Sequence, residues 1–311
     1  MDDLVSVIIA TYNRPTLLKR ALRSVEKQTH KNLEVIIIDD CSKFSPEHII
    51  SQFKSLNIRY FRNKTNSKVA YSTNKGVKLA KGEYIALLGD DDEWTSKCKI
   101  ENQLGCIKNS KKSNVGAVFT GFRYIDDFTK KEIESIYPNI GGNLLKKILV
   151  KNGILASTTV LMPSSVWQSI GGYNENITRG IDSDLFRRLL IANYNIVSIN
   201  KIMANVYIGR KDRMGYGSSS ESLEMHIRSE KYKLNRFKLI FEEYSFEKKE
   251  VYKKISKHEY KAWIFSRKNT YLINSTYHLF KSMPFTKGQY LNSAKTMLGR
   301  FYNILILCLT R

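Results

Sequence analysis

Short apolar runs alternate with helical patterns over the first ninety residues. Residues 5–10 form a continuous, mostly β-branched run, which is typical of a strand buried on both faces of a parallel sheet. The apolar positions of residues 17–25 then recur at helical spacing behind Pro15, a residue suited to the first turn of a helix. The alternation continues, with strands expected at residues 34–38, 58–61 and 84–88. Such repeated units predict an α/β fold with a mostly parallel, Rossmann-like sheet flanked by helices.

The pattern is mixed in the middle of the chain and helical at its end. We expect strands at residues 115–119, 121–125, 155–162, 197–199 and 203–208, and helices at 164–170 and 182–193. Residues 209–220, rich in Gly, Ser and Arg, are expected to form a linker or a mobile loop. Everything beyond Glu221 is expected to be helical. We therefore expect one domain of residues 1–215 and a basic, helical C-terminal region of residues 216–311.

Polar residues stand where the predicted strands end. Thr11, Asn13 and Arg14 follow the first strand, and Asp39 and Asp40 follow the second. Ligands of parallel sheets bind beyond the carboxyl ends of the strands, where such acids accept hydrogen bonds from a base or a ribose. A turn or helix-capping role is the alternative for one of the two aspartates, and a surface charge is the alternative for Arg14.

Three consecutive aspartates, Asp90, Asp91 and Asp92, follow the fourth predicted strand. Adjacent carboxylates repel one another unless a cation neutralises them, and hard oxygen ligands suit Mg²⁺ or Mn²⁺. A metal there would stabilise the charge that develops on a departing diphosphate. A solvated acidic turn is the alternative interpretation.

The formal net charge of +22 implies a polyanionic partner, which could be nucleic acid, an anionic membrane surface or a phosphorylated substrate. The apolar fraction of 42% argues against disorder. No apolar stretch approaches the ~20 residues that span a bilayer. The acidic start is unlike a secretory signal, and the four cysteines lack zinc-ligand spacing. These features favour a cytoplasmic protein with reduced thiols.

Three segments together resemble the signatures of the family 2 glycosyltransferases, which have the GT-A fold. They are VSVIIATYNRP at residues 5–15, EVIIIDDCS at 34–42 and GEYIALLGDDDEW at 82–94. The resemblance covers roughly residues 4–210, and it includes Asn74 and, more loosely, Lys68. It implies that Thr11 and Asp39 or Asp40 bind the nucleoside of the donor.

The resemblance also implies roles for the acidic run, in which Asp90 would contact ribose or sugar hydroxyls and Asp91 would hold the metal. The family frequently has aspartate at the position of Gly89, so the coordinating pair is either Asp90 with Asp92 or Asp91 with Asp92. Further along, residues 171–185 resemble a turn followed by an acid pair at a helix start. Asp182 matches the catalytic base, although Ile181 replaces the first acid of the pair. A helix N-cap is the alternative role for Asp182.

The C-terminal third combines basic charge with aromatic and apolar side chains. From Glu221 onward there are 18 Lys and Arg against 8 Asp and Glu. Amphipathic helices and an apolar segment at residues 301–309 would allow contact with anionic lipid headgroups. A helical cap on the first domain is the alternative, and residues 210–213 could close over a diphosphate.

We therefore expect an inverting glycosyltransferase that uses a nucleoside-diphosphate sugar, with a UDP-sugar as the first choice, and Mn²⁺ or Mg²⁺. The expected acceptor is a glycan or lipid-linked sugar in bacterial surface-polysaccharide assembly, at the inner face of the plasma membrane. A dinucleotide oxidoreductase is disfavoured because the first turn lacks GxGxxG. A non-catalytic nucleotide-sugar-binding module would share the same sheet, and a nucleic-acid-binding protein would explain the positive charge. The latter leaves the acidic strand ends unexplained, so we expect no nucleic-acid partner.

Overall fold

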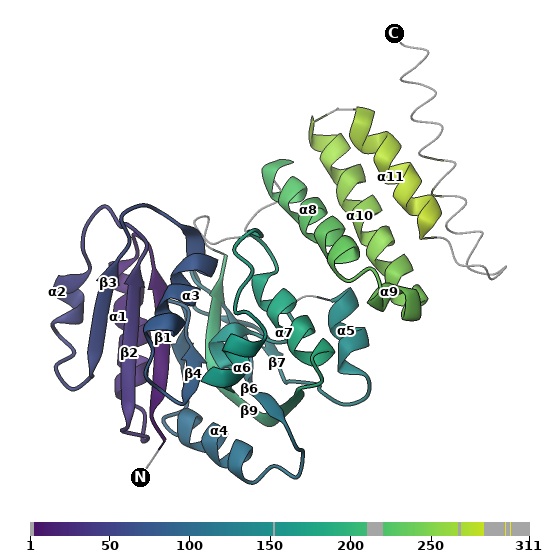
Figure 1. The fold of residues 1–311 in the computed structure, drawn as a ribbon. Coiled ribbons are helices and arrows are strands. Elements are labelled where there is room, and N and C mark those ends of the chain that lie inside the picture. The colour runs from purple at the N-terminus through teal and green to yellow at the C-terminus, as the bar shows by residue number, and fades with distance from the viewer. Residues whose placement is uncertain are drawn as a thin grey trace. The chain divides into compact units, whose positions relative to one another are not determined.

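The computed structural model describes residues 3–151, 153–209, 220–266 and 269–282, together with residues 296 and 299. The chain divides into two compact units, Met1–Arg210 and Lys211–Arg311 (Figure 1). The expected boundary at residue 215 lies outside the described residues. So do most of the expected linker, including the basic cluster 210–213, and the apolar segment 301–309.

The first unit is built on one nine-stranded sheet in the order β3-β2-β1-β4-β8-β6-β9-β5, with β7 paired to β6. The half formed by β3, β2, β1 and β4 is entirely parallel, and β8 then runs antiparallel to β4 and β6. The strands are β1 (Val5–Thr11), β2 (Leu33–Asp39), β3 (Ile58–Arg62), β4 (Tyr84–Leu87), β5 (Glu93–Trp94), β6 (Val115–Asp126), β7 (Glu132–Ile136), β8 (Leu161–Pro163) and β9 (Asn195–Ile208).

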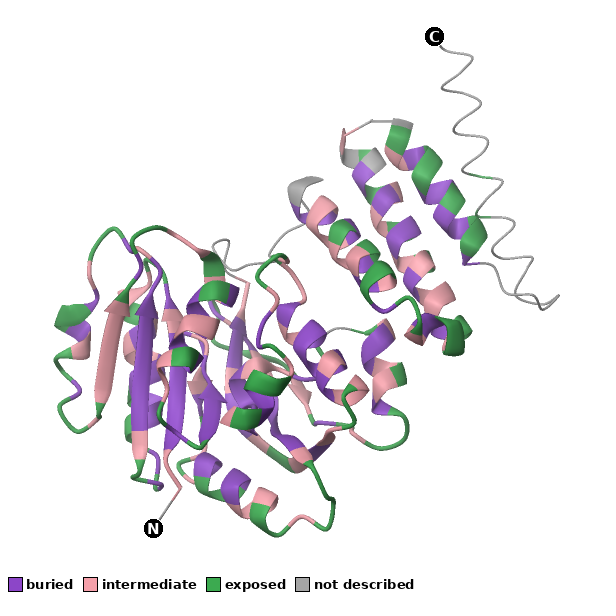
Figure 2. Cartoon of the chain, in the orientation of Figure 1, coloured by how far each residue is buried: buried purple, intermediate pink, exposed green. Residues whose placement is uncertain are grey.

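Helices cover both faces of this sheet. Successive strand residues point to opposite sides, so apolar residues of the same strand are buried against the helices on each face. Ile8 of β1 belongs to the core that holds α3 and α7, whereas Val7 and Ile9 belong to the core that holds α1 and α4. The central strands are buried almost throughout (Figure 2). The helices of this unit are α1 (Pro15–Glu26), α2 (Glu47–Ile50), α3 (Lys68–Leu79), α4 (Lys99–Lys108), α5 (Leu144–Val150), α6 (Ser164–Ser169) and α7 (Ile181–Ile191). The expected α/β fold is confirmed.

The middle of the chain differs in detail from the expectation. The two strands expected at residues 115–125 form the single strand β6, and those expected at 197–208 form the single strand β9. Within the strand expected at residues 155–162, Ser157–Thr159 form a short 3₁₀ turn instead. The backbone hydrogen bonds of this turn are local, and β8 starts only after it. Helices α4 and α5 and strands β5 and β7 are additional to the expected elements.

The second unit is helical over its described residues, as expected. Its helices are α8 (Ser220–Arg236), α9 (Ile240–Glu243), α10 (Ser245–Ser266) and α11 (Asn269–Lys281). Its core is made of Leu223, Ile227, Phe237, Phe241, Val251, Ile255, Ala262, Leu272 and Leu279. Among the described residues of the whole chain, none of the helices has the length and apolar character required to cross a bilayer.

Candidate active site

The carboxyl ends of β1, β2 and β4 lie together at one edge of the sheet. Thr11 ends β1 in register with Asp39, which ends β2, and the Asp40 N–H donates to the Thr11 carbonyl at 2.8 Å. Strand β4 ends beside Ile8, so the chain that follows it reaches the same edge. There the Thr11 hydroxyl donates to Asp90 Oδ2 at 2.8 Å. Thr11 therefore joins the three polar clusters that the sequence places at strand ends.

The aspartates after β4 form a buried acidic cluster. Asp90, Asp91 and Asp92 are each at most 7% exposed. Arg14 Nη1 lies 3.2 Å from Asp90 Oδ1 and 3.3 Å from Asp91 Oδ2. Burial, and next the Asp91 carboxylate, raise the pKa of Asp90 to about 6, although Arg14 and the Thr11 hydroxyl act in the opposite direction. The solvated-turn interpretation is wrong, because these carboxylates are shielded from water.

Gly89 shapes the place where two of these carboxylates converge. A Cβ on Gly89 would lie 3.0 Å from Asp92 Oδ2 and 3.1 Å from Asp91 Oδ1. These hard oxygens are the ligands that Mg²⁺ and Mn²⁺ prefer. Within the described part of the chain, no group of three His, Cys, Asp or Glu residues is placed to hold a metal ion. The oxygens of Asp91 and Asp92 are two ligands that this edge could offer to such a cation.

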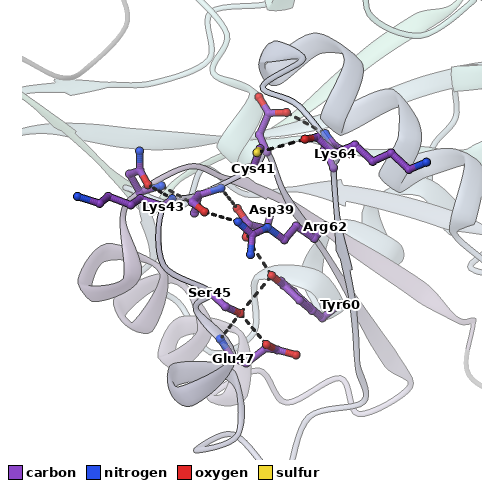
Figure 3. Close-up of polar contacts among 12 residues, drawn as sticks. Asp39, Cys41, Lys43, Ser45, Glu47, Tyr60, Arg62 and Lys64 are labelled. Atoms are coloured by element: carbon purple, nitrogen blue, oxygen red, sulfur yellow. Dashed lines mark hydrogen bonds and ion pairs between the residues drawn. The ribbon is translucent and has the colours of Figure 1, made fainter.

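Asp39 is fully buried and bound by protein groups at the end of β2 (Figure 3). Its carboxylate accepts hydrogen bonds from the Ser42 N–H and from the Tyr60 hydroxyl, both at 2.9 Å. Arg62 Nε lies 3.8 Å from the same carboxylate. Asp39 therefore fixes the loop after β2, which is the turn role that the sequence left open for it.

Asp40 performs a similar task for the loop before α3. Its carboxylate accepts from Asn63 Nδ2, from the Ser67 N–H and from the Lys68 N–H, at distances of 2.7–2.8 Å. The Lys68 side chain itself is exposed. On the neighbouring loop, Asn13 Oδ1 accepts from the Lys43 N–H at 2.7 Å.

The backbone of these loops is unusual. Asn13, Cys41 and Lys68 have φ angles of 55°, 68° and 70°, a left-handed conformation that is uncommon outside glycine. Such conformations persist only where the surrounding structure determines them, and they concentrate at functional sites. The three positions follow β1 and β2 or begin α3, around the edge that carries Thr11 and Asp90.

Asp182 lies in the first turn of α7. The N-cap of this helix is Gly180, with φ at 73°, so the capping role for Asp182 is wrong. The Tyr173 hydroxyl donates to Asp182 Oδ1 at 2.5 Å. Burial, and next the Asp182 carboxylate, raise the pKa of Tyr173 well above its ordinary value, so the hydroxyl remains a proton donor. Asp184, two residues further along the helix, forms an ion pair with Arg188 at 2.8 Å.

Asn74 belongs with Asp182 rather than with the Thr11 edge. Its Oδ1 accepts from the Tyr173 N–H at 2.8 Å, and its Nδ2 donates to the Tyr173 carbonyl and to Glu175 Oε1. A Cβ on Gly172 would lie 2.6 Å from Asn74 Oδ1, so glycine is required for this close approach. The amide thus fastens the turn that carries Tyr173 to α3. Its role as a nucleotide ligand stays a prediction.

Arg20 is a site residue that the sequence did not reveal. Its Nη2 donates to the Asp91 carbonyl, its Nη1 lies 3.4 Å from Asp127 Oδ1, and its guanidinium carbon lies 3.5 Å from the centroid of the Tyr207 ring. The Tyr207 N–H in turn donates to Asp92 Oδ1 at 3.2 Å. In the sequence Arg20 is one of several cations on the polar side of a helix, and nothing distinguishes it.

The fold resembles that of solved glycosyltransferases. The structure of S. aureus TarS residues 1–349 with UDP-GlcNAc matches at a TM-score of 0.59 and 15% identity, over 96% of this chain and 81% of that one. The mannosyltransferase PcManGT from Pyrobaculum calidifontis, in complex with GDP-Man and Mn²⁺, matches at 0.55 and 14%, over 98% and 81%. At these identities the likeness concerns the fold, which is of the GT-A class.

Residues 6–163 match the family described as Glycosyl transferase family 2, and the chain belongs to that family. An uncharacterized glycosyltransferase of Rickettsia felis is 36% identical over 209 residues, which are 67% of this chain and 33% of that protein. The Escherichia coli protein WfaP, named UDP-Glc:alpha-D-GlcNAc-diphosphoundecaprenol beta-1,3-glucosyltransferase, is 33% identical over 159 residues, or 51% and 61% of the two chains. The matched region thus spans one third to about three fifths of these relatives.

Proposed function

We propose that this chain transfers a sugar from a nucleoside-diphosphate donor to an acceptor hydroxyl with inversion at the anomeric carbon. The observation that carries the proposal is the buried carboxylate cluster at the ends of β1 and β4, in a member of a glycosyltransferase family. Its negative charge suits a cation that accompanies a diphosphate.

The donor would lie along the edge that carries Thr11. Thr11, Asn13, Arg14, Asp39, Asp40, Lys68 and Asp90 are the proposed donor-binding residues of this edge. Asn74, whose amide is bonded to the turn that carries Tyr173, is proposed as a further donor-binding residue on the side of Asp182. Arg14 is a cation beside the acidic cluster, and it can turn from these carboxylates toward a phosphate. Because the carboxylates of Asp39 and Asp40 hold their own loops, we propose that both act on the nucleoside mainly by shaping those loops.

Asp91 and Asp92 are the residues that would hold Mn²⁺ or Mg²⁺. They are preferred over a pair with Asp90, because an oxygen of each lies beside Gly89, within 3.0–3.1 Å of the place where a Cβ would stand. When bound, the ion supplies electrostatic stabilisation of the departing diphosphate. PcManGT was solved with Mn²⁺ and GDP-Man, which supports a metal for this fold.

Asp182 is the proposed catalytic base. The hydrogen bond from Tyr173 to Oδ1 orients the carboxylate, which accepts the proton of the acceptor hydroxyl. The deprotonated oxygen attacks the anomeric carbon, the bond to the diphosphate breaks, and the configuration inverts. One proton moves to Asp182, and the nucleoside diphosphate leaves with the bonding electrons.

A lipid-linked glycan is the proposed acceptor, and bacterial surface-polysaccharide assembly is the proposed role. The name of WfaP gives a UDP-sugar donor and a diphosphoundecaprenol-linked acceptor, and the TarS structure holds UDP-GlcNAc. The net charge of +22 suits an anionic membrane, so we propose that the enzyme works at the inner face of the plasma membrane. UDP-sugars are the donors to test first.

The decisive experiment is a screen of nucleotide sugars for release of nucleoside diphosphate with Mn²⁺. Extensive chelation should abolish release, and added Mn²⁺ or Mg²⁺ should restore it. Asp91→Asn should lose activity with its fold intact. Full activity of the metal-free protein would remove the metal from the proposal.

Asp182→Asn separates an enzyme from a non-catalytic binding module. As the base, Asp182 should contribute roughly 10²–10⁴-fold to the rate. The variant should bind donor normally yet turn over slowly, while the exposed-surface control Glu134→Gln should behave as the wild type. Near wild-type turnover of Asp182→Asn would exclude this residue as the base.

A further inference from the structure

The short 3₁₀ turn Ser157–Thr159 contacts both halves of the candidate active site. The turn stands one residue before β8, which runs antiparallel to β4 with Leu161 opposite Ala86. Because the two strands are antiparallel, the residues before β8 lie beside the residues after β4, where the acidic cluster begins. The two threonines of the turn are buried and its serine is half-buried.

The hydroxyl of Thr158 contacts the loop of the acidic cluster. Thr158 Oγ1 accepts a hydrogen bond from the Gly89 N–H at 3.1 Å. Oxygens of Asp91 and Asp92 lie within 3.0–3.1 Å of the place where a Cβ of Gly89 would stand. The Thr158 hydroxyl therefore holds the peptide group beside which these two carboxylates come together.

The hydroxyl of Ser157, one residue earlier, contacts the other half of the site. It shares a hydrogen bond with the Tyr173 hydroxyl. The single hydroxyl proton of Tyr173 is directed to Asp182 Oδ1, at 2.5 Å, so Ser157 is the donor in its bond with Tyr173. Hydrogen bonds in such a chain polarise one another, so Ser157 strengthens the bond that Tyr173 donates to Asp182.

Buried side chains of β5 and α4 hold the backbone carbonyls of the turn. Trp94 Nε1 donates to the Thr158 carbonyl at 2.8 Å, and Gln103 Nε2 donates to the Thr159 carbonyl at 2.8 Å. Lys99 is fully buried, and its Nζ donates to Gln103 Oε1 at 2.7 Å. The same Nζ lies 4.3 Å from the centroid of the Trp94 ring. This buried network fixes the turn, and with it the positions of its hydroxyls.

We propose that the Ser157–Thr159 turn is a positioning element of the active site. Thr158 aligns the loop of the acidic cluster, and Ser157 aligns the proposed base through Tyr173. The inference rests on the proposed function, because it assigns the turn to that reaction. The alternative is a turn that only supports the core, for which neither of these two hydroxyls would affect the site.

A pair of substitutions at Thr158 tests the contact with the acidic cluster. Thr158→Val removes the hydroxyl and keeps the branched shape, whereas Thr158→Ser keeps the hydroxyl. Calorimetric titration of the nucleotide-free full chain with Mn²⁺ should show roughly tenfold weaker binding to Thr158→Val, the size expected when a group that orients a metal ligand is lost. Thr158→Ser should restore most of that affinity. Circular dichroism verifies that each variant is folded.

Ser157→Ala tests the contact with the proposed base, and it does so independently if Thr158→Val does not fold. The cooperative part of a hydrogen-bond chain is about 10–30% per bond, so the acidic limb of the pH–rate profile should move upward by up to about half a unit. In a Tyr173→Phe background the same substitution should produce no further shift, because the bond that it weakens is already absent. The matched control is Ser24→Ala, since the Ser24 hydroxyl donates to the Ala21 carbonyl within α1 at 2.7 Å.

The inference is overturned if Thr158→Val binds Mn²⁺ as tightly as Thr158→Ser. It is also overturned if Ser157→Ala moves the acidic limb no more than Ser24→Ala, or by the same amount with and without the Tyr173 hydroxyl. These results, obtained with a wild type that releases nucleoside diphosphate, leave the proposed function intact. A wild type that neither binds Mn²⁺ nor releases nucleoside diphosphate from any donor overturns the proposed function, and the inference with it.

Discussion

Tyr173→Phe isolates one hydrogen bond of the proposed base. The Tyr173 ring packs edge-on against Trp167 at a centroid distance of 5.0 Å, and phenylalanine keeps that packing. What is lost is the donor to Asp182 Oδ1 at 2.5 Å, together with the hydrogen bond between the Tyr173 hydroxyl and the Ser157 side chain. Because the pKa of Tyr173 is raised well above its ordinary value, the wild-type hydroxyl donates at every working pH.

The size of the effect follows from the charge of the acceptor. A hydrogen bond to a charged group contributes about 1.5–3 kcal/mol. It stabilises the ionised carboxylate more than the protonated one, and about 1.36 kcal/mol corresponds to one pH unit. The acidic limb of the pH–rate profile should therefore move upward by about 1–2 units in the variant. Donor affinity should stay unchanged.

The assay is the initial rate of nucleoside diphosphate release across pH at saturating donor. Tyr194→Phe is the matched control, because the Tyr194 hydroxyl shares a 3.0 Å hydrogen bond with Ser169 in an exposed position. An acidic limb that does not move, or that moves equally in both variants, would refute the assigned role of Tyr173.

Three further perturbations concern the acidic cluster. Asp90→Asn should raise the free energy of unfolding of the chelated protein by up to about 3 kcal/mol at neutral pH, because the ionised wild-type side chain is destabilised by burial. This gain should vanish as pH falls from about 6 through the ordinary value of 3.8. Arg14→Gln should strengthen Mn²⁺ binding to the nucleotide-free protein roughly tenfold in calorimetry, since a competing cation beside Asp91 is removed. Arg20→Ala should cost roughly 2 kcal/mol or more in urea unfolding, because Asp127 and the Asp91 carbonyl lose a buried donor.

The pH dependence of the Asp90 effect follows from proton binding by the native protein. The folded-state pKa of Asp90 lies above its ordinary value, so the native protein binds more protons in that window, and wild-type stability falls as pH rises through it. An Asp90→Asn gain in the free energy of unfolding that is independent of pH would contradict this reasoning.

For Arg20, the control is Arg123→Ala. The side chains of Arg123 and its partner Glu132 are 43% and 47% exposed, so their pair should contribute less than about 1 kcal/mol. Equal losses in the two arginine variants would remove the special role of Arg20.

The sequence by itself determined at which edge of the sheet the candidate site residues lie. Buried β-branched runs separated by helical patterns specify parallel strands, and parallel strands bring their carboxyl ends to one edge. The sequence alone therefore places Thr11, Asp40 and Asp90 at the same edge. The signal is local, because each polar residue directly follows the strand that positions it.

Only the tertiary structure decided what those residues contact. Asn74 and Tyr173 are 99 positions apart, and Arg20 and Asp127 are 107 apart, so no spacing rule relates them. Their roles depend on how the helices pack against the sheet. That packing decides which hydrogen-bond donors and acceptors are buried next to one another.

The orientation of α11 makes the same point in the second unit. Periodicity shows that this helix has an apolar side, but it does not say what that side faces. The buried Glu259 and its partner His278 fix the answer, because a desolvated carboxylate must keep its donors. Packing therefore decided that Leu272 and Leu279 are buried while Ile273, Tyr277 and Phe280 are exposed.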